Sequence, residues 1–277
     1  MVATAVIVST YNSPRYLDLC LQALRRQNVQ NFEIVVADDG SGDETRALVE
    51  DHQDKASIEI KHVWQRDAGF RKTRILNKSL AATHADYLIF TDGDCLAHPE
   101  FVAEHIKTSQ PGTYVNGSLI RLNSRLTEHI KSLDLVHEDM FDSGWLRRHG
   151  EHYDRRFLRL SLPYRLRVRL NHWSKTTLYW LGSNSSCFRK DAIAVNGFDN
   201  RFTYGYEDGD FGNRLENYGL TPQTVRWTAL ALHLDHEKPW SDPLEIERNR
   251  QRETPIEPGG RYKAVDGLEQ LAATDSD

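Results

Sequence analysis

The first hundred residues alternate short apolar runs with longer amphipathic segments. In one such segment, residues 16–26, the apolar side chains Leu17, Cys20, Leu21 and Leu24 share one helical face. This alternation is typical of βαβ units wound around a parallel sheet, so we expect an α/β fold. The predicted strands cover 4–10, 33–37, 58–63 and a run ending at 92, and the predicted helices cover 16–26, a segment from about 44, and 71–82.

An acidic pair, Asp92 and Asp94, directly follows the apolar run from Tyr87 to Phe90. In an open α/β sheet, ligands bind in the crevice outside the carboxyl ends of the strands, where this pair is expected to lie. Carboxylate oxygens at that place suit a hard divalent cation that also meets phosphate oxygens. Taken alone, the pair is equally typical of a solvated turn after a strand.

Charge and cysteine usage limit the classes of protein. The chain has 277 residues, with 35 basic against 40 acidic side chains and a net charge of −5, which gives no general signature of nucleic-acid binding. No apolar run is long enough to cross a bilayer, and the start lacks a signal-peptide pattern, so a cytoplasmic protein is expected. Three widely spaced cysteines indicate reduced thiols.

Six motifs occur in an order that resembles a known family. The first three are Ser9-Thr10-Tyr11-Asn12, Val36 to Ser41, and Thr91-Asp92-Gly93-Asp94. The others are the blocks 182–190, 196–199 and 204–211. Residues 1–120 resemble the nucleotide-sugar half of an inverting GT-A glycosyltransferase of family 2. Residues 177–240 resemble the carboxyl-terminal block of chondroitin-type polymerases and β-1,4-galactosyltransferases.

The resemblance implies a GT-A fold, with a Rossmann-like, mostly parallel central sheet flanked by helices. Residues 1–240 are then one catalytic domain, in which 1–120 bind the nucleotide sugar and 177–240 form the acceptor and catalytic half. Residues 121–176 are a basic helical insertion. Residues 241–277 read as an arm over the domain or between subunits, with frayed last residues. The oligomeric state is not predicted.

The resemblance also implies a metal site. Asp94 is expected to bind the cation directly, while Asp92 lies closer to the ribose or acts through water. His233 resembles the distant histidine that completes the site, and an imidazole ligand favours Mn²⁺ over Mg²⁺. The alternative is that His233 is a hydrogen-bonded core histidine and His236 is the ligand.

On the other side of the sugar, Asp208 is the candidate base for the acceptor hydroxyl, because a carboxylate usually serves this purpose in the family. Glu207 would then hold a hydroxyl of donor or acceptor. The alternative is that these acids, or Asp210, cap the helix that carries Phe211 and Leu215.

The resemblance implies that the basic residues Arg66 and Arg74 and the small-residue segment 182–184 bind the donor, and Thr10, Tyr11 and Asn12 lie just after the first predicted strand. Asp39 is expected to accept a hydrogen bond from uracil, which points to a UDP-sugar, and surface charge is the favoured explanation for Arg71 and Lys72. A tight turn would explain the small residues equally well. The expected donor-binding residues are Thr10, Tyr11, Asn12, Asp39, Arg66, Arg74, Asp92, Gly182, Ser183 and Asn184.

One motif departs from the related enzymes. Tyr204-Gly205-Tyr206 stands where they carry Trp-Gly-Gly, so a ring replaces a glycine immediately before Glu207. Tyr204 can still stack on a sugar face, whereas Tyr206 should narrow the acceptor pocket. Neither galactose nor N-acetylgalactosamine is therefore predicted as the donor sugar.

The segment from Arg147 to Lys175 is rich in arginine inside an acidic protein. Its arginines and leucines could rest on anionic headgroups or meet a phosphorylated lipid acceptor, and pairing with acidic neighbours explains the charge equally well. Residues 166–170 alternate with a period of two, and Pro163 is expected to break any continuous helix.

These features predict a metal-dependent inverting glycosyltransferase. It would move one sugar from a UDP-sugar to a carbohydrate or glycolipid acceptor, in the assembly of a bacterial surface polysaccharide or lipopolysaccharide. We expect it in the cytoplasm or bound peripherally to the inner face of the membrane. The alternatives are a sugar-nucleotide pyrophosphorylase, whose glycine-rich loop is replaced here by Thr10 to Arg15, and a non-catalytic carbohydrate-binding relative.

Overall fold

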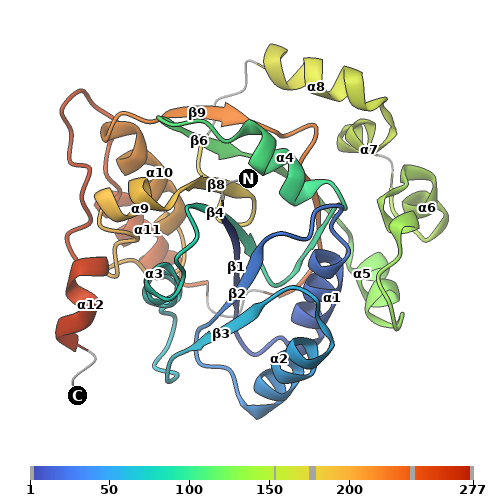
Figure 1. Cartoon of the computed structure of the whole chain (residues 1–277), viewed down its shortest axis with the longest axis horizontal. Coiled ribbons are helices and arrows are strands. Elements are labelled where there is room, and N and C mark those ends of the chain that lie inside the picture. Colours follow the sequence, from blue (N-terminus) through green and yellow to red (C-terminus); the bar gives the residue numbers. More distant parts are fainter. Residues whose placement is uncertain (1–2, 153, 175–178, 238–240, 275–277) are drawn as a thin grey trace.

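A seven-stranded sheet forms the centre of the chain, with strand order β3-β2-β1-β4-β8-β6-β9 (Figure 1). The computed structural model describes residues 3–152, 154–174, 179–237 and 241–274. The strands of this sheet are β1 (Thr4–Thr10), β2 (Glu33–Asp38), β3 (Ile60–Trp64), β4 (Tyr87–Asp92), β6 (Thr113–Asn116), β8 (Ser185–Phe188) and β9 (Thr221–Thr224).

The first four strands are parallel, as the alternating pattern predicts. β1 pairs with β2 and β4 in a register that sets Thr10 beside Asp38 and Ser9 beside Asp92. Their carboxyl ends therefore meet at one edge of the sheet. β8 runs antiparallel to both β4 and β6, which makes the sheet mixed beyond β4. The expected mostly parallel α/β sheet is confirmed.

Helices cover both faces of the sheet (Figure 1). β1 explains why: its alternate residues Val6 and Val8 pack with Leu17 and Leu21 on one side, whereas Ala5 and Ile7 pack with residues of the other side. The helices of the two faces are α1 (Pro14–Arg25), α2 (Asp43–Lys55), α3 (Lys72–Ala82), α4 (Phe101–Thr108), α9 (Arg189–Ala194) and α10 (Glu207–Asn217).

A smaller sheet returns distant residues to the end of β4. It consists of β5 (Cys95–Ala97), β10 (Leu230–His233) and β7 (Ser118–Arg121), in the order β5-β10-β7. Antiparallel pairing of β10 with β5 sets His233 opposite Cys95, and the Leu234 amide donates to the Asp94 carbonyl at 3.0 Å. The polar pattern after β4 and the His233 segment are therefore neighbours in space.

The arginine-rich insertion is helical. It comprises α5 (Ser124–Lys131), a 3₁₀ turn η1 (Glu138–Phe141), α6 (Ser143–Arg148), a second turn η2 (Arg155–Phe157), α7 (Leu158–Ser161) and α8 (Tyr164–Trp173). Pro163 precedes the first residue of α8 and separates it from α7, as expected. The helical insertion agrees with the expectation, and residues 166–170, whose hydropathy alternates with a period of two, lie inside α8.

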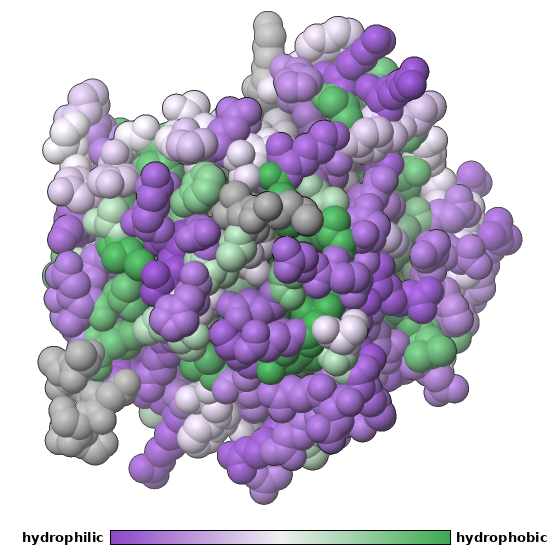
Figure 2. Space-filling model, viewed as in Figure 1, coloured by the Kyte–Doolittle hydropathy of each residue, from purple (hydrophilic) through white to green (hydrophobic). Residues whose placement is uncertain are grey.

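Hydrophilic side chains dominate the face of the molecule seen in Figure 2, with hydrophobic residues in small areas between them. Among the residues that the structure describes, no helix is both long enough and apolar enough to span a bilayer.

The arm after residue 240 packs on the same chain through α11 (Pro243–Arg252) and α12 (Leu268–Thr274). Thr254 donates its hydroxyl to Asp210 at 2.7 Å, and Asn196 donates its side-chain amide to the Ala264 carbonyl at 3.1 Å. These bonds fix the residues after 240 to α10 and to Asn196, which lies shortly after α9. The last residues 275–277, which we expect to fray, and Lys175 lie outside the described residues.

Candidate active site

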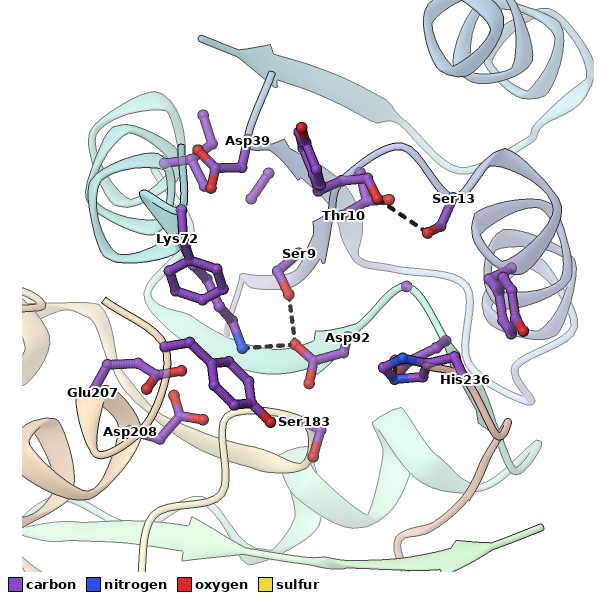
Figure 3. A pocket seen from close by; sticks show the side chains of 18 of the residues that line it. Ser9, Thr10, Ser13, Asp39, Lys72, Asp92, Ser183, Glu207, Asp208 and His236 are labelled. Carbon is purple, nitrogen blue, oxygen red and sulfur yellow. Dashed lines mark hydrogen bonds and ion pairs between the residues drawn. The ribbon is translucent and has the colours of Figure 1, made fainter. Parts of the chain in front are cut away.

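One cavity of about 750 Å³ opens at the carboxyl ends of β1 and β4. Figure 3 shows Asp92 in its middle, with Glu207 and Asp208 of α10 to one side and His236 to the other. Asp94 and Asp208 line this same cavity. The two groups that the sequence assigns to opposite sides of a reaction therefore face a shared space.

Asp94, His233 and His236 form a cluster whose ligand atoms all lie within 4.8 Å of one another. The Asp94 Oδ2 atom is 2.8 Å from Nε2 of His236 and 3.7 Å from Nε2 of His233. The sequence left His233 and His236 as alternatives, but the structure brings both beside Asp94. The pairing of β10 with β5 places His233, and His236 follows three residues later.

The cluster has the chemistry of a divalent metal site. His236 donates its Nδ1 proton to the Glu237 carbonyl at 2.8 Å, which directs Nε2 toward Asp94. With its proton on Nδ1, His236 has a lone pair on Nε2, so Nε2 and Asp94 Oδ2 are both acceptors. Two acceptor atoms 2.8 Å apart require a proton or a cation between them. Burial alone would raise the pKa of Asp94, but the His236 hydrogen bond and the nearby His233 hold that pKa below its usual value. An anionic oxygen with two imidazoles suits Mn²⁺ or a similar ion.

Asp92 stands apart from this cluster. Its Oδ1 atom accepts hydrogen bonds from the Ser9 hydroxyl at 2.5 Å and from Lys72 Nζ at 3.0 Å (Figure 3). Of the acidic pair Asp92 and Asp94, only Asp94 therefore contacts the histidines. Asp92 is oriented toward the acidic end of the cavity by its two donors.

Lys72, the first residue of α3, reaches into the cavity from the helix start. Its side chain is only 17% exposed, so the surface-charge explanation given from the sequence is wrong for this residue. Burial would lower the pKa of its ammonium, but the charges of Asp92, Asp208 and Glu207 raise that pKa well above its ordinary value. The sequence did not identify Lys72 as a residue of this cavity.

Glu207 and Asp208 project into the cavity from the first turn of α10 (Figure 3). Tyr206 is the N-cap residue and its side chain makes no capping hydrogen bond. The Asp208 carboxylate accepts from the Gly182 amide, outside the helix, so capping does not explain Asp208, whereas the Glu207 carboxylate accepts from its own amide and from that of Gly205. Burial and the neighbouring Asp208 charge raise the pKa of Glu207 to about 7, against the effect of Lys72. Burial also raises the pKa of Asp208, and Lys72 opposes it there too.

The small residues before β8 have different positions: Gly182 contacts Asp208, Ser183 lines the cavity and Asn184 points into the core. The Gly182 amide donates to Asp208 Oδ2 at 3.2 Å, and a Cβ atom on Gly182 would lie 2.3 Å from both carboxylate oxygens. Ser183 lines the cavity. Asn184 is fully buried and donates to the carbonyls of Ser118 and Ala229, so it fixes β8 to the smaller sheet.

The expected nucleotide residues divide into two groups. Thr10, Tyr11 and Asp39 line the cavity, and Asp39 accepts hydrogen bonds from the Gln65 side chain at 2.6 Å and the Arg71 amide at 2.7 Å. Burial raises the pKa of Asp39 in spite of these donors. Asn12, Arg66 and Arg74 do not line it.

Asn12 has a role within the protein. Its amide donates to the Ser41 hydroxyl at 2.8 Å, and its side-chain oxygen accepts from the Gly42 amide at 3.0 Å. It therefore locks the loop after β1 to the loop after β2.

Comparison with family models assigns both halves of the chain. Residues 5–166 match the model described as glycosyl transferase family 2, and residues 165–237 match the N-terminal domain of galactosyltransferase. The validoxylamine A glucosyltransferase of Streptomyces hygroscopicus subsp. jinggangensis is 32% identical over 241 residues, which are 84% of this chain and 56% of that protein. The chondroitin synthase of Escherichia coli is 25% identical over 252 residues, covering 83% of this chain and 34% of that protein.

Solved structures show the same fold. Staphylococcus aureus TarS in complex with UDP-GlcNAc superposes with a TM-score of 0.61 at 18% identity, over 90% of this chain and 65% of that one. The mannosyltransferase PcManGT from Pyrobaculum calidifontis, in complex with GDP-Man and Mn²⁺, gives 0.58 at 15% identity, over 86% and 59%. The chain spans about half the length of the validoxylamine A glucosyltransferase. The family model matches more than half of the present chain, which therefore belongs to glycosyltransferase family 2.

Proposed function

We propose that this protein is a metal-dependent inverting glycosyltransferase. It transfers a single sugar from a UDP-sugar donor to a carbohydrate or glycolipid acceptor. The biological setting that we propose is the assembly of a bacterial surface polysaccharide or lipopolysaccharide.

One observation carries the proposal: the cavity has a metal-type cluster on one side and a pair of neighbouring acids on the other. Asp94 lies with His233 and His236, whereas Asp208 lies beside Glu207, and Asp92 and Lys72 occupy the space between them. Inverting transfer needs opposite faces of the anomeric carbon to meet a leaving diphosphate and an attacking alcohol. In this arrangement the metal-type cluster would face the leaving diphosphate, and Asp208 would face the attacking alcohol.

Asp208 is the base in this proposal. As the acceptor oxygen bonds to the anomeric carbon, its proton passes to the Asp208 carboxylate, and the bond from that carbon to UDP breaks with its electron pair going to the diphosphate. Oδ1 of Asp208 is buried without a hydrogen-bond partner among the described residues, so it is free to receive that proton. A divalent cation held by Asp94, His233 and His236 would offset the charge that develops on the diphosphate.

The donor half of the proposal draws on position and on relatives. Asp39, Thr10 and Tyr11 line the end of the cavity that follows β1 and β2, where a nucleotide base is expected. TarS is described in complex with UDP-GlcNAc and with UDP, which supports a uridine nucleotide here. The donor sugar is left open.

The acceptor half includes contact with an anionic membrane. Three insertion arginines are used within the protein: Arg159 donates to Ser118, Arg167 pairs with Glu100 at 3.5 Å, and Arg156 pairs with Asp154. The other arginines between residues 147 and 175 are exposed: Arg147, Arg148, which lies 4.0 Å from Asp142, Arg155, Arg165 and Arg169. These five favour peripheral binding on the inner face of the cell membrane, close to a lipid-linked acceptor.

The test is a screen of nucleotide sugars with Mn²⁺ that measures released UDP, with and without candidate acceptors. We expect release from a uridine donor that depends on the metal. Failure of every donor with every acceptor would reject the proposal and leave a carbohydrate-binding protein without turnover. Release of pyrophosphate from UTP and a sugar phosphate would instead support the nucleotidyltransferase alternative, which membership of glycosyltransferase family 2 argues against.

A further inference from the structure

Tyr206 has a backbone conformation that bulky residues rarely adopt. Its φ of 68° and ψ of −7° lie in the left-handed region. Of the described non-glycine residues, Asn12 and Asn196 also have positive φ, but asparagine tolerates this region far better than tyrosine does. A glycine at this position would remove the strain. The tyrosine is therefore retained against a conformational cost.

The surrounding structure holds this conformation in place. Gly205 has a φ of 96° and faces Ile246 of α11, to which a Cβ atom would come within 3.3 Å. Asn249 of α11 donates its side-chain amide to the Tyr204 carbonyl at 3.2 Å, and the Tyr204 ring meets Phe70 edge-on at 5.7 Å. The chain direction at Tyr206 is thus imposed by its neighbours, and strain of this kind concentrates at functional sites.

The ring of Tyr206 does nothing visible for the fold. It lines the cavity beside Glu207 and Asp208 and is 36% exposed. In the part of the chain that the structure describes, its hydroxyl makes no hydrogen bond and its ring has no aromatic partner. The ring of this strained residue faces the cavity and contributes little to the fold. Contact with a ligand is the best explanation for its presence.

We propose that Tyr206 selects the acceptor, an inference that rests on the proposed function. Its ring offers a stacking surface to the C–H face of a cyclic polyol, meaning a pyranose or a cyclitol. Its bulk also leaves room for one ring at this place and excludes acceptors that are branched on the stacked side. Asp208 fixes the assignment to the acceptor, because the base meets the acceptor hydroxyl while the metal cluster and Asp39 lie toward the donor.

Three substitutions distinguish the effect of the Tyr206 ring from the effect of its backbone conformation. Tyr206→Phe keeps the ring, Tyr206→Asn keeps a residue that tolerates the left-handed region, and Tyr206→Gly relieves the strain. Tyr218→Asn is the matched control, since Tyr218 is an exposed tyrosine at the other end of α10 that does not line the cavity. We expect Tyr206→Gly to raise the Tm by roughly 2 °C.

The kinetic readout is the acceptor KM, measured with methyl pyranosides, myo-inositol and branched disaccharides, together with donor hydrolysis in the absence of acceptor. We expect Tyr206→Gly and Tyr206→Asn to raise KM for single-ring acceptors by about three- to tenfold. Branched acceptors should gain activity relative to single rings, whereas Tyr218→Asn, outside the cavity, should leave donor hydrolysis unchanged. Tyr206→Phe and Tyr218→Asn should match the wild type. An unchanged KM and acceptor ranking in both ring-deleting variants would overturn the proposal.

A binding measurement distinguishes this proposal from the proposed function. If the wild type turns over no donor, the proposed function fails, and saturation-transfer NMR of the same single-ring sugars with UDP present tests Tyr206 directly. Transfer to the sugar C–H protons in the wild type, and its loss in Tyr206→Asn, would support a stacking role. Equal transfer in both proteins, or none in the wild type, would reject it.

Discussion

Lys72 Nζ lies 3.0 Å from Asp92 Oδ1, and the same ammonium is the cation that opposes the raised pKa values of Glu207 and Asp208. The Lys72 ammonium therefore interacts with the carboxylates of Asp92, Glu207 and Asp208, at the end of the cavity that holds the proposed base. The contact makes the protonation state of Asp208 dependent on a residue from a different helix.

Replacing Lys72 should move the pH dependence of turnover. In Lys72→Met the opposing cation is lost, so the pKa values of Asp208 and Glu207 rise further. Because the base must be ionised, the acid limb of the kcat profile should shift to higher pH. Lys72→Arg keeps the charge and should shift it far less. Equal profiles for Lys72→Met and the wild type would contradict this role.

Removing the proposed base should abolish most turnover. Asp208→Asn has nearly the same size but cannot accept the acceptor proton, so kcat should fall by about 10²- to 10⁴-fold. UDP binding, measured by calorimetry with Mn²⁺ present, should be retained because Asp208 lies on the acceptor side. A variant that keeps more than a tenth of the wild-type kcat would argue against Asp208 as the base.

The histidines predict a metal requirement with unequal contributions. Since His236 Nε2 is 2.8 Å from Asp94 Oδ2 and His233 Nε2 is 3.7 Å away, His236→Ala should weaken Mn²⁺ binding at least as much as His233→Ala. Losses of about 10- to 100-fold in metal affinity are expected. Chelator treatment followed by titration with Mn²⁺ measures this, with exposed His152→Ala as the control. Full activity after chelation would contradict a metal role.

Glu207→Gln should stabilise the fold while it damages activity. The pKa of Glu207 is about 7 in the folded protein and its ordinary value is 4.5, so the folded state pays to ionise it. Below pH 4.5 both states bind the proton and there is no cost. The cost grows between 4.5 and 7 and is complete above 7. The variant should therefore gain roughly 1 to 3 kcal/mol of unfolding free energy at about pH 8 and almost none near pH 4.5. A gain of equal size at both pH values would point to a cause other than ionisation.

The sequence predicts the first half of the fold well, because strands buried on both faces must be continuous apolar runs. β1 begins and ends as predicted at residues 4 and 10, and β4 ends at Asp92. The helical insertion is harder. Residues 166–170 alternate in hydropathy, but Arg167 is the buried residue of α8, since its charge pairs with Glu100.

The candidate site is predictable by residue type and less by orientation. The motif groups Gly182 and Asn184 in the sequence. It does not show that the Gly182 amide contacts Asp208 while the Asn184 side chain points into the core. Lys72 was misjudged for the same kind of reason. A lysine at a helix start is usually solvated, and only the approach of α10, more than a hundred residues later, buries it among carboxylates.

If the insertion binds a membrane, that binding should depend on its exposed arginines. Arg165 and Arg169 on α8 are exposed, and Trp173 at the end of the same helix is 70% exposed, whereas Arg167 is buried. We expect flotation with vesicles containing phosphatidylglycerol at about 50 mM salt and loss of flotation at about 500 mM, because surface charges are screened. Arg165→Glu with Arg169→Glu should abolish it. The same charge reversal at Arg248 and Arg250 of α11 should not, since those arginines already pair with Glu245 and Glu247. If flotation does not change with the salt concentration, or persists in the Arg165→Glu, Arg169→Glu variant, these arginines contact the protein itself or its acceptor and not the membrane.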